Sequence, residues 1–452
     1  MKKTVNHILV AGLLALLSLA SCTDEFIEGN YLQGVDRDKR VEVRLPFGVG
    51  RGITTTITTR AAGGEIDYDS QLSGVMAFVY EAKSDNPEEN ELLAYHLFSN
   101  PSNKPLEGAT GGWIADNDDP TCGEIKFYVP VGDVYIYLLG NAQSSFLNFF
   151  PGVSGGDALG TQAEFFEKAT PKWNGNIHSV DGYLPLTGMV NNNTGLCHVN
   201  EQGQISYTDE EGKTHILLPD GKHDEDNSFV LKRLMSKITM NIREGKGVKF
   251  TARDYTVRHI PHYVSPTAQA WTEEERDRIL VEDAKPVNFG LLDSLTFTIY
   301  LPENIRKVRS GVEITEYRQR DKVVKTADNK NTEETAPDDF HADNADNHKG
   351  HYKFEFAPKA STYIELTGWF ENADKTVAAD VRYYIHLGNF GKDLNHFSVE
   401  RDHHYTYNVT INGVDDIVVE VEDENEKTPE RKEWCSSMRL SHISMPILTR
   451  WR

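Results

Sequence analysis

Apolar and polar residues alternate along several stretches of the chain. The apolar positions of three such rows are Leu295, Phe297, Ile299 and Leu301; Val381, Tyr383, Ile385 and Leu387; and Tyr405, Tyr407, Val409 and Ile411, followed by Ile417, Val419 and Val421. A period of two is typical of a strand with one buried and one exposed face. The rows therefore predict half-buried β-strands.

The last row is interrupted by Asn412-Gly413, a pair that readily adopts the positive φ angles of a tight turn. Residues 405–421 are therefore expected to form a hairpin. Residues 326–351 are polar, charged and aperiodic, which favours a long solvated loop.

Helix signals are few. Thr161 with Glu164 and Thr272 with Glu275 form capping boxes, each of which predicts one short helix. A chain of 452 residues can hold two core-bearing domains. The sequence thus predicts an all-β fold of two antiparallel β-sandwich domains in tandem.

The N-terminus has the pattern of an export signal. Two lysines precede an apolar run from Ile8 to Leu19, and the run ends in Leu19-Ala20-Ser21-Cys22. This ending resembles a bacterial lipobox, in which Cys22 receives the lipid and becomes the first residue of the mature chain; an ordinary signal peptide ending at a cysteine is the alternative. No second apolar span follows. The remainder is expected to be exported and tethered to a membrane surface by acyl chains on Cys22.

Charge and cysteine content limit the classes of partner and ligand that the chain is expected to bind. The chain has 47 basic and 69 acidic residues, and its net charge of −22 argues against nucleic acid as a partner. Beyond Cys22 there are Cys122, Cys197 and Cys435, too few for a disulfide framework and without a C-x-x-C pair for zinc. One disulfide is compatible with these three cysteines, and its pairing stays open.

Residue types that are common in enzyme active sites occur in the sequence, but they do not have the spacing of a catalytic or metal-binding motif. Residues 341–351 hold three histidines and two aspartates, yet they match neither the His-Glu-x-x-His site nor the EF-hand. His403-His404 opens a predicted strand and is interpreted as structural. The sequence therefore predicts no catalytic residue, no metal site and no cofactor; a metal-dependent hydrolase is the remaining enzymatic alternative.

Five segments resemble, in this order, the fimbrillins of Bacteroidales. They are 127–143, 181–190, 229–242, 297–306 and 381–422 with a gap, and the resemblance runs from about Gln71 to Glu422. It implies two transthyretin-like β-sandwich domains and a role in building surface pili. The expected organisation is a signal peptide (1–21), a lipidated leader with a removable strand (22–60), an N-terminal domain (61–245), a C-terminal domain (246–425) and a tail (426–452).

Leu184–Gly188 reads LPLTG, like the sorting signal of Gram-positive surface proteins. Such a signal sits at the C-terminus, ahead of a membrane span, whereas here more than half of the chain follows. The segment instead resembles the family's Pro-x-Thr-Gly strand and is expected to be structural. Asp293-Ser294-Leu295 resembles an O-glycosylation acceptor of the same bacterial group, with Ser294 as the modified residue.

The leader contains an alternating row and a candidate processing site. Val41, Val43, Leu45 and Phe47 alternate with polar residues or proline, and Ile53 and Ile57 continue an apolar face. In similar fimbrillins an arginine-specific protease cuts after such a strand, and Arg60-Ala61 matches that site. Arg44 and Arg51 compete as cleavage points. The alternative is that Arg60 lies in an ordinary surface loop and the strand stays in the fold.

The tail is a candidate donor strand that would fill a neighbouring subunit's groove by β-augmentation. Ile443, Met445 and Ile447 alternate, but Pro446 removes one ladder donor. A frayed tail is the alternative.

These observations predict a pilus subunit, or a pilus-associated surface lipoprotein, that assembles by protease-triggered strand exchange and serves adhesion. Its partners would be other pilin subunits and, through the lipid on Cys22, the outer membrane. The receptor and the position in a pilus stay open. The alternative is a lipid-anchored protein that binds glycans through some of its 19 tyrosines and 6 tryptophans.

Overall fold

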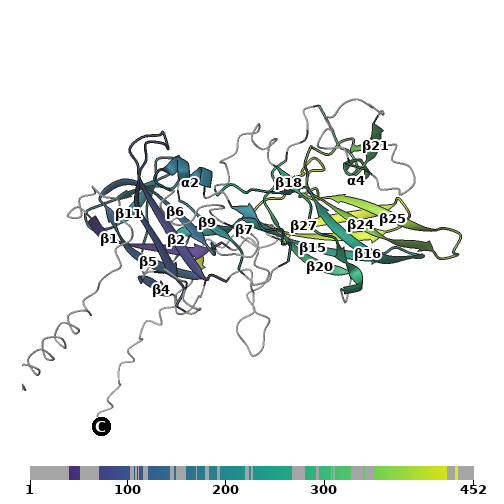
Figure 1. Ribbon diagram of the computed structural model, residues 1–452, viewed down its shortest axis with the longest axis horizontal. Helices are drawn as coiled ribbons and strands as arrows, with labels where there is room; N and C mark the ends of the chain where they lie inside the picture. Colours follow the sequence, from purple (N-terminus) through teal and green to yellow (C-terminus); the bar gives the residue numbers. More distant parts are fainter. Residues whose placement is uncertain are drawn as a thin grey trace, which may run out of the picture.

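The chain is an all-β protein, which confirms the predicted fold class. In the computed structural model, two β-rich units follow one another along the longest axis (Figure 1). We call them the first unit, which holds β1 to β14, and the second unit, which holds β15 to β27. The structure describes residues 40–50, 71–101, 106, 109, 111–115, 121–142, 147–148, 159–168, 171–178, 183–190, 194–218, 223–224, 228–266, 280–291, 295–306, 308, 311–326, 340–341, 351–424 and 433–435.

The first unit is built on one 11-stranded sheet. Its main path runs β12-β11-β10-β6-β9-β14-β1-β5-β4, and β2 joins β6 to β3 off this path. The strands are β1 (Arg40–Val49), β2 (Gly74–Glu81), β3 (Leu92–Ser99), β4 (Trp113–Ala115), β5 (Cys122–Pro130), β6 (Gly132–Gly140), β9 (Leu186–Gly188), β10 (Leu196–Val199), β11 (Ile205–Thr208), β12 (Thr214–Ile216) and β14 (Phe229–Arg233). Ile205 of β11 and Ile125 of β5 belong to the same buried cluster, so the sheet curls around one core.

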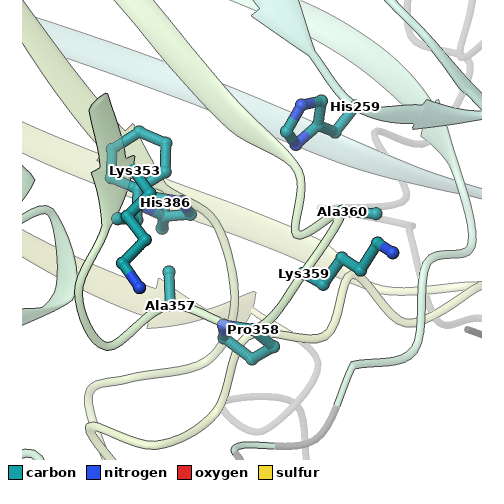
Figure 2. Close-up of a pocket in the computed structure, with 8 residues that line it drawn as sticks. His259, Lys353, Ala357, Pro358, Lys359, Ala360 and His386 are labelled. Carbon is teal, nitrogen blue, oxygen red and sulfur yellow. The ribbon is translucent and has the colours of Figure 1, made fainter. Parts of the chain in front are cut away.

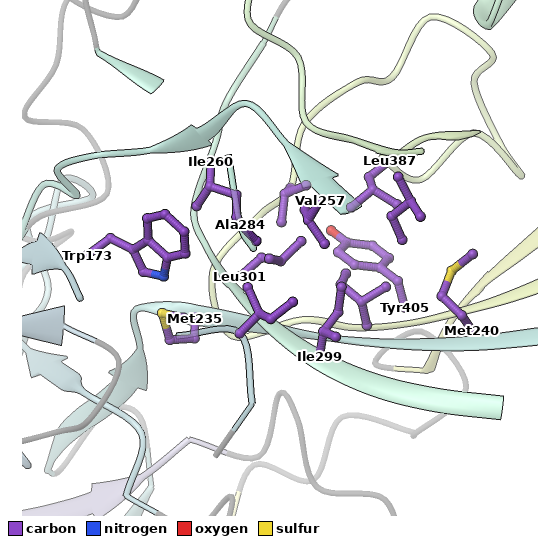
Figure 3. Packing of buried hydrophobic residues seen from close by; sticks show 14 of the residues in the cluster. Trp173, Met235, Met240, Val257, Ile260, Ala284, Ile299, Leu301, Leu387 and Tyr405 are labelled. Atoms are coloured by element: carbon purple, nitrogen blue, oxygen red, sulfur yellow. The ribbon is translucent and has the colours of Figure 1, made fainter. Parts of the chain in front are cut away.

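The second unit packs two four-stranded sheets, β20-β15-β26-β27 and β19-β16-β24-β25. Their strands are β15 (Met235–Glu244), β16 (Val248–Arg258), β19 (Val287–Asn288), β20 (Thr296–Pro302), β24 (Tyr363–Asn372), β25 (Ala378–His386), β26 (His404–Ile411) and β27 (Ile417–Asp423). Ile299 and Tyr405 of one sheet share a buried cluster with Val257 of the other (Figure 3). The unit is therefore a β-sandwich.

Small elements complete the two units. They are β7 (Leu147–Asn148), α2 (Gln162–Lys168), β8 (Lys172–Trp173), β13 (His223–Asp224), β17 (Ile260–Pro261), β18 (Val281–Glu282), η5 (Phe289–Leu291), α4 (Tyr317–Arg320), β21 (Val323–Thr326), β22 (Phe340–His341), β23 (His351–Phe354) and β28 (Glu433–Cys435). Within the described ranges, no helix is long and apolar enough to cross a membrane.

The three alternating rows are confirmed as β20, β25 and the β26–β27 hairpin, in which Ile411 pairs with Ile417. The predicted tight turn is wrong. Asn412 and Gly413 both donate their backbone N–H to the carbonyl of Asp416, and neither has a positive φ angle. These bonds close a longer loop, so the turn does not need the conformation for which Asn-Gly is suited.

The first predicted helix is confirmed as α2. The Glu164 N–H donates to Thr161 Oγ1 and the Thr161 N–H to Glu164 Oε2, both at 3.2 Å, which is the reciprocal bonding of a capping box. The second predicted helix, at Thr272, lies outside the described residues. Of the predicted loop at 326–351, the structure describes Thr326, Phe340–His341 and His351. These residues lie in the strands of a small sheet, β21-β23-β22.

The two units share a junction. The segment 171–178, which follows α2 of the first unit, bonds by backbone to the second: the Trp173 N–H donates to the His262 carbonyl at 2.9 Å, and the Tyr300 N–H donates to the Ile177 carbonyl at 2.8 Å. Trp173 is buried beside Ile260 (Figure 3). The chain passes from one sheet system to the other between Arg233 and Met235, so β15 belongs to the second unit's sheet although the expected border is at 245.

Candidate strand-exchange site

Strand β1 lies inside the first unit's sheet, between β5 and β14. It pairs antiparallel with β5 from Arg40 opposite Pro130 to Gly48 opposite Cys122, and parallel with β14 only from Phe47 to Val49. The structure describes the chain again from 71 onward, so β1 is connected to β2 through the segment that holds Arg60. β1 is thus a central strand joined to its sheet mainly by one ladder.

The inward face of β1 is part of the core. Val43, Leu45 and Phe47 are fully buried and Val49 is 5% exposed. The ring of Phe47 packs edge-on against Trp113 at 5.0 Å between centroids. Each such side chain contributes about 1.5–3 kcal/mol when buried, so the four together contribute about 6–12 kcal/mol. We call the space that they fill the β1 groove.

The backbone of β1 explains its proline. The Val49 N–H donates to the Thr121 carbonyl beside β5, and the Gly50 N–H donates to the Leu231 carbonyl of β14. Because successive N–H groups of a strand point to opposite sides, odd-numbered residues face β5 and even-numbered residues face away. Pro46 is even-numbered. Its missing N–H therefore removes no hydrogen bond to β5.

The outward face of β1 carries charge pairs to β5. Arg44 Nε donates to Glu124 Oε2 at 2.9 Å, and the Glu124 side chain is only 8% exposed. In the neighbouring pair, Lys126 Nζ lies 3.4 Å from Glu42 Oε1, and these two side chains are 34% and 39% exposed. A buried carboxylate depends on its cation far more than an exposed one does. Arg44–Glu124 is therefore expected to stabilise β1 more than Glu42–Lys126 does.

Both ends of β1 are held by other elements. Arg233, which is fully buried, donates from Nη1 to the Gly50 carbonyl and, at 2.8 Å, to Asp402 Oδ1 of the second unit. Near the other end, a Cβ on Gly203 would lie 2.1 Å from the Glu42 carbonyl oxygen, and Gly203 has a φ of 74°. Only glycine allows this approach.

One titratable group in the interior next to β1 is His96 of β3. It is buried and packs against Phe127, with ring centroids 5.4 Å apart and ring planes tilted by 49°. Burial, with a smaller contribution from Arg40, lowers the pKa of His96 to about 4, so the ring stays neutral. The face that β1 covers here is therefore uncharged, which suits the apolar side chains of β1.

The LPLTG segment is confirmed as structural. Leu186–Gly188 forms β9, which pairs with β6 and β14, and Leu184, Leu186 and Thr187 are all buried. A protease or transpeptidase could not reach the Thr187–Gly188 bond without unfolding the sheet.

Several predicted site residues lie outside the described residues. They are the lipidation residue Cys22, the cleavage residues Arg60 and Ala61, the acceptor Ser294, and the donor residues Ile443, Met445 and Ile447. Their assignments stay predictions.

A group of buried polar residues in the second unit was not predicted. Glu303 and Arg401 form a two-pronged ion pair, with Nε–Oε2 at 2.7 Å and Nη2–Oε1 at 2.8 Å, and Arg401 also donates to the Ser265 carbonyl. The Asn304 amide donates to the Ala360 carbonyl at 3.0 Å. Glu303 and Arg401 lie in two of the segments that resemble fimbrillins, so the signal was present, but their pairing spans 98 positions.

The structure gives the oxidation state of two cysteines. Cys122 is disulfide-bonded, and Cys197 is a buried free thiol. Burial raises the pKa of the Cys197 thiol, so it stays protonated and unreactive.

A small pocket in the second unit is lined by two histidines and two lysines among other residues (Figure 2). Burial lowers the pKa of His259 to about 4, and burial likewise lowers that of His386, whose Nδ1 lies 2.8 Å from Asp321 Oδ1. Both rings are therefore neutral near pH 7. Among the described residues, no group of three or more His, Cys, Asp or Glu side chains could hold a metal ion.

Some of the described aromatic residues considered for glycan binding, among them Tyr137 and Trp173, are buried. The rings of Tyr137 and Phe165 stack at 5.0 Å, and both are fully buried. Trp369 of β24 is 42% exposed, and Trp173 is buried.

Comparison with known proteins gives distant matches. Residues 299–409 match a family described as "Domain of unknown function (DUF4906)". No curated protein sequence matches the chain. Among solved structures, the tip fimbrial protein Mfa3 from Porphyromonas gingivalis, with a C-terminal truncation, is 13% identical over 85% of this chain and 99% of its own, with a TM-score of 0.44. The fimbrial anchor protein Mfa2 from Porphyromonas gingivalis is 9% identical over 85% and 97%, with a TM-score of 0.29. The chain is similar to these proteins at a level that carries no argument about its function.

Proposed function

We propose that the chain is a subunit of a surface pilus, or a lipoprotein associated with one, and that it assembles by strand exchange in a role in adhesion. A protease cut after Arg60 releases β1, and an extended segment of another subunit takes its place beside β5. The lipid on Cys22 holds the precursor at the outer membrane. The resemblance of five segments to fimbrillins supports this proposal, and the geometry of β1 is the observation that carries it.

β1 is suited to exchange because it is central in the sheet yet separable in the chain. Its ladder to β5 supplies main-chain hydrogen bonds, and its alternate side chains supply four apolar contacts to the core. An empty groove would expose the edge of β5 beside this core. Any strand of matching pattern could then add to the edge by β-augmentation.

The energetics require a replacement strand. The stability of a domain is about 5–15 kcal/mol, and the four buried side chains of β1 contribute a comparable amount. A subunit that lost β1 without a donor would therefore be close to unfolding. Release of β1 and entry of the donor must be coupled in one exchange step.

The proposal is tested by blocking the cut. Full-length Arg60→Ala should fold normally, but it should yield no oligomers after treatment with an arginine-specific protease, because β1 stays covalently attached. The wild-type chain treated in the same way should give a ladder of oligomers by size-exclusion chromatography and non-boiled gel electrophoresis. Arg51→Ala is the matched control and should behave like wild type. Normal oligomer ladders from Arg60→Ala would contradict the cleavage step.

Anchoring is tested separately. Cys22→Ala should abolish incorporation of a labelled fatty acid and release the chain from the membrane fraction, because a lipid contributes about 0.8 kcal/mol per buried methylene and no other anchor is proposed. Cys197→Ala controls for loss of a cysteine as such. Surface-exposed, membrane-bound Cys22→Ala protein at the wild-type level would overturn the anchor.

A further inference from the structure

The start of the tail returns to the first unit after the chain has passed through the second. β28 (Glu433–Cys435) follows β27 in the sequence, yet it pairs antiparallel with β13 of the first unit, with Cys435 opposite His223. Both β28 and β13 also contact β1. The backbone of Cys435 therefore belongs to a strand that adjoins the candidate strand-exchange site.

Cys122 adjoins the same strand from another side. It is the first residue of β5 and lies opposite Gly48, near the C-terminal end of β1. Cys122 is 2% exposed, and its sulfur is in a disulfide bond. Cys122 and Cys435 thus lie on two strands that both contact β1, although they are far apart in the sequence.

The other cysteines of the chain narrow the choice of partner for Cys122. The chain has four cysteines. Cys197 is a free thiol. Cys22 carries the lipid in the proposed function, and a thioether sulfur cannot enter a disulfide. Cys435 is the cysteine that remains, and it is also the one that the pairing of β28 brings to the first unit.

We infer that Cys122 and Cys435 form a disulfide that ties the base of the tail to the first unit. We call this bond the tail bridge. The inference rests on the proposed function in one respect, which is the lipid on Cys22. Two thiols lose two protons and two electrons when the bond forms. A disulfide of another protein outside the cytoplasm takes them up by thiol–disulfide exchange and becomes a dithiol.

The tail bridge sets the point from which the tail leaves the subunit. The short β13–β28 ladder is too small to hold the tail by itself, whereas a covalent bond keeps it at β5. The candidate donor residue Ile443 is eight residues beyond Cys435. An extended chain spans at most about 3.6 Å per residue, so Ile443 stays within about 29 Å of Cys435. A tail that donates to a second copy of this chain therefore connects the first units of the two copies.

Peptide mapping without reduction tests the bond directly. The full-length chain is isolated with its lipid from the membrane fraction, unfolded, alkylated at free thiols and digested for mass spectrometry. One pair of peptides should join Cys122 to Cys435, and Cys197 should carry the alkyl group. Alkylated Cys122 or Cys435 overturns the inference, and so does a bond from Cys122 to Cys22 or to another copy of the chain.

A second experiment tests whether the bond holds the tail. The recognition site of a highly specific protease is inserted after Thr428, between β27 and β28, and a label is attached to the C-terminus. After the cut, the label should run with the full-length protein on a denaturing gel without reductant. With reductant it should run as a small fragment. A small labelled fragment without reductant overturns the tail bridge.

Two matched variants show which cysteine is responsible. In Cys435→Ser protein the labelled fragment should separate without reductant, whereas Cys197→Ala protein should behave like the wild type. Retention of the label in Cys435→Ser protein overturns the assignment of Cys435. The mapping of the wild-type chain needs no variant, so it decides the question even if Cys435→Ser protein does not fold.

Failure of the tail bridge and failure of the proposed function give different results. Both experiments use protein that is not cut after Arg60, so neither needs strand exchange. A bond between Cys122 and Cys435 in a chain that forms no oligomers supports the bridge and contradicts the exchange. Free Cys122 and Cys435 in a chain that forms oligomers overturn the bridge alone. A bond between Cys122 and Cys22 overturns the bridge and the lipid anchor together.

Discussion

Replacing Phe47 by alanine in the full-length chain should lower the free energy of unfolding of the first unit by about 3–5 kcal/mol. Phe47 is fully buried, packs on Trp113 and lies close to Gly123, where a Cβ would come within 3.1 Å of its ring. The truncation leaves a cavity, because the backbone at Gly123 packs directly against the Phe47 ring. Urea unfolding followed by tryptophan fluorescence measures the loss.

The same substitution also tests whether β1 stays in the first unit or leaves it on assembly. Glu42→Ala on the same strand is exposed and should change stability by less than about 0.5 kcal/mol. If β1 is expelled on assembly, oligomers formed from Phe47→Ala protein should be as stable as wild-type oligomers, although the precursor is weaker. A precursor that tolerates Phe47→Ala with a loss below about 1 kcal/mol would show that β1 contributes little to the core.

Arg401→Ala should destabilise the second unit by about 3–5 kcal/mol, because it leaves Glu303 charged and buried without the guanidinium that it contacts at two points. The side chains of Arg401 and Glu303 are 7% and 10% exposed. Thermal unfolding monitored by circular dichroism at 218 nm is a suitable measurement.

Two further variants identify the cause. The double variant Arg401→Met with Glu303→Met should be more stable than Arg401→Ala alone, since no charge is then buried. Arg318→Ala removes an ion pair whose side chains are 66% and 40% exposed and should cost less than about 1 kcal/mol. Equal losses from Arg318→Ala and Arg401→Ala would mean that burial does not decide the strength of these pairs.

The strands were predictable because a half-buried strand leaves its period in the sequence. Val43, Leu45 and Phe47 are fully buried, as their alternation predicts, and the same holds for Phe297, Ile299 and Leu301 to within a few per cent of exposure. Local hydrogen bonding likewise made α2 predictable from Thr161 and Glu164.

Pairing partners were not predictable, because they depend on contacts between distant segments. Nothing in Arg40–Val49 shows that β5 lies on one side and β14 on the other, and the Arg44–Glu124 pair joins residues 80 positions apart. Arg233 illustrates the same limit: an arginine at a strand end is normally a surface residue, yet here it is fully buried between Gly50 and Asp402. The sequence therefore predicted the candidate site as a strand, but it did not predict the neighbouring strands or the Arg44–Glu124 ion pair.

The parallel pairing of β15 with β26 constrains the order in which the chain can fold. Asn241 and Asn408, opposite each other in this ladder, are 167 positions apart, whereas β15 begins directly after β14 completes its part of the first unit. If the chain is exported N-terminus first, as the proposed signal peptide implies, it can close the first unit while β26 is still inside the export channel. During that interval one edge of β15 has no partner from its own chain and can pair with strands of other chains. Slowing translocation should therefore increase aggregation through the second unit more than through the first.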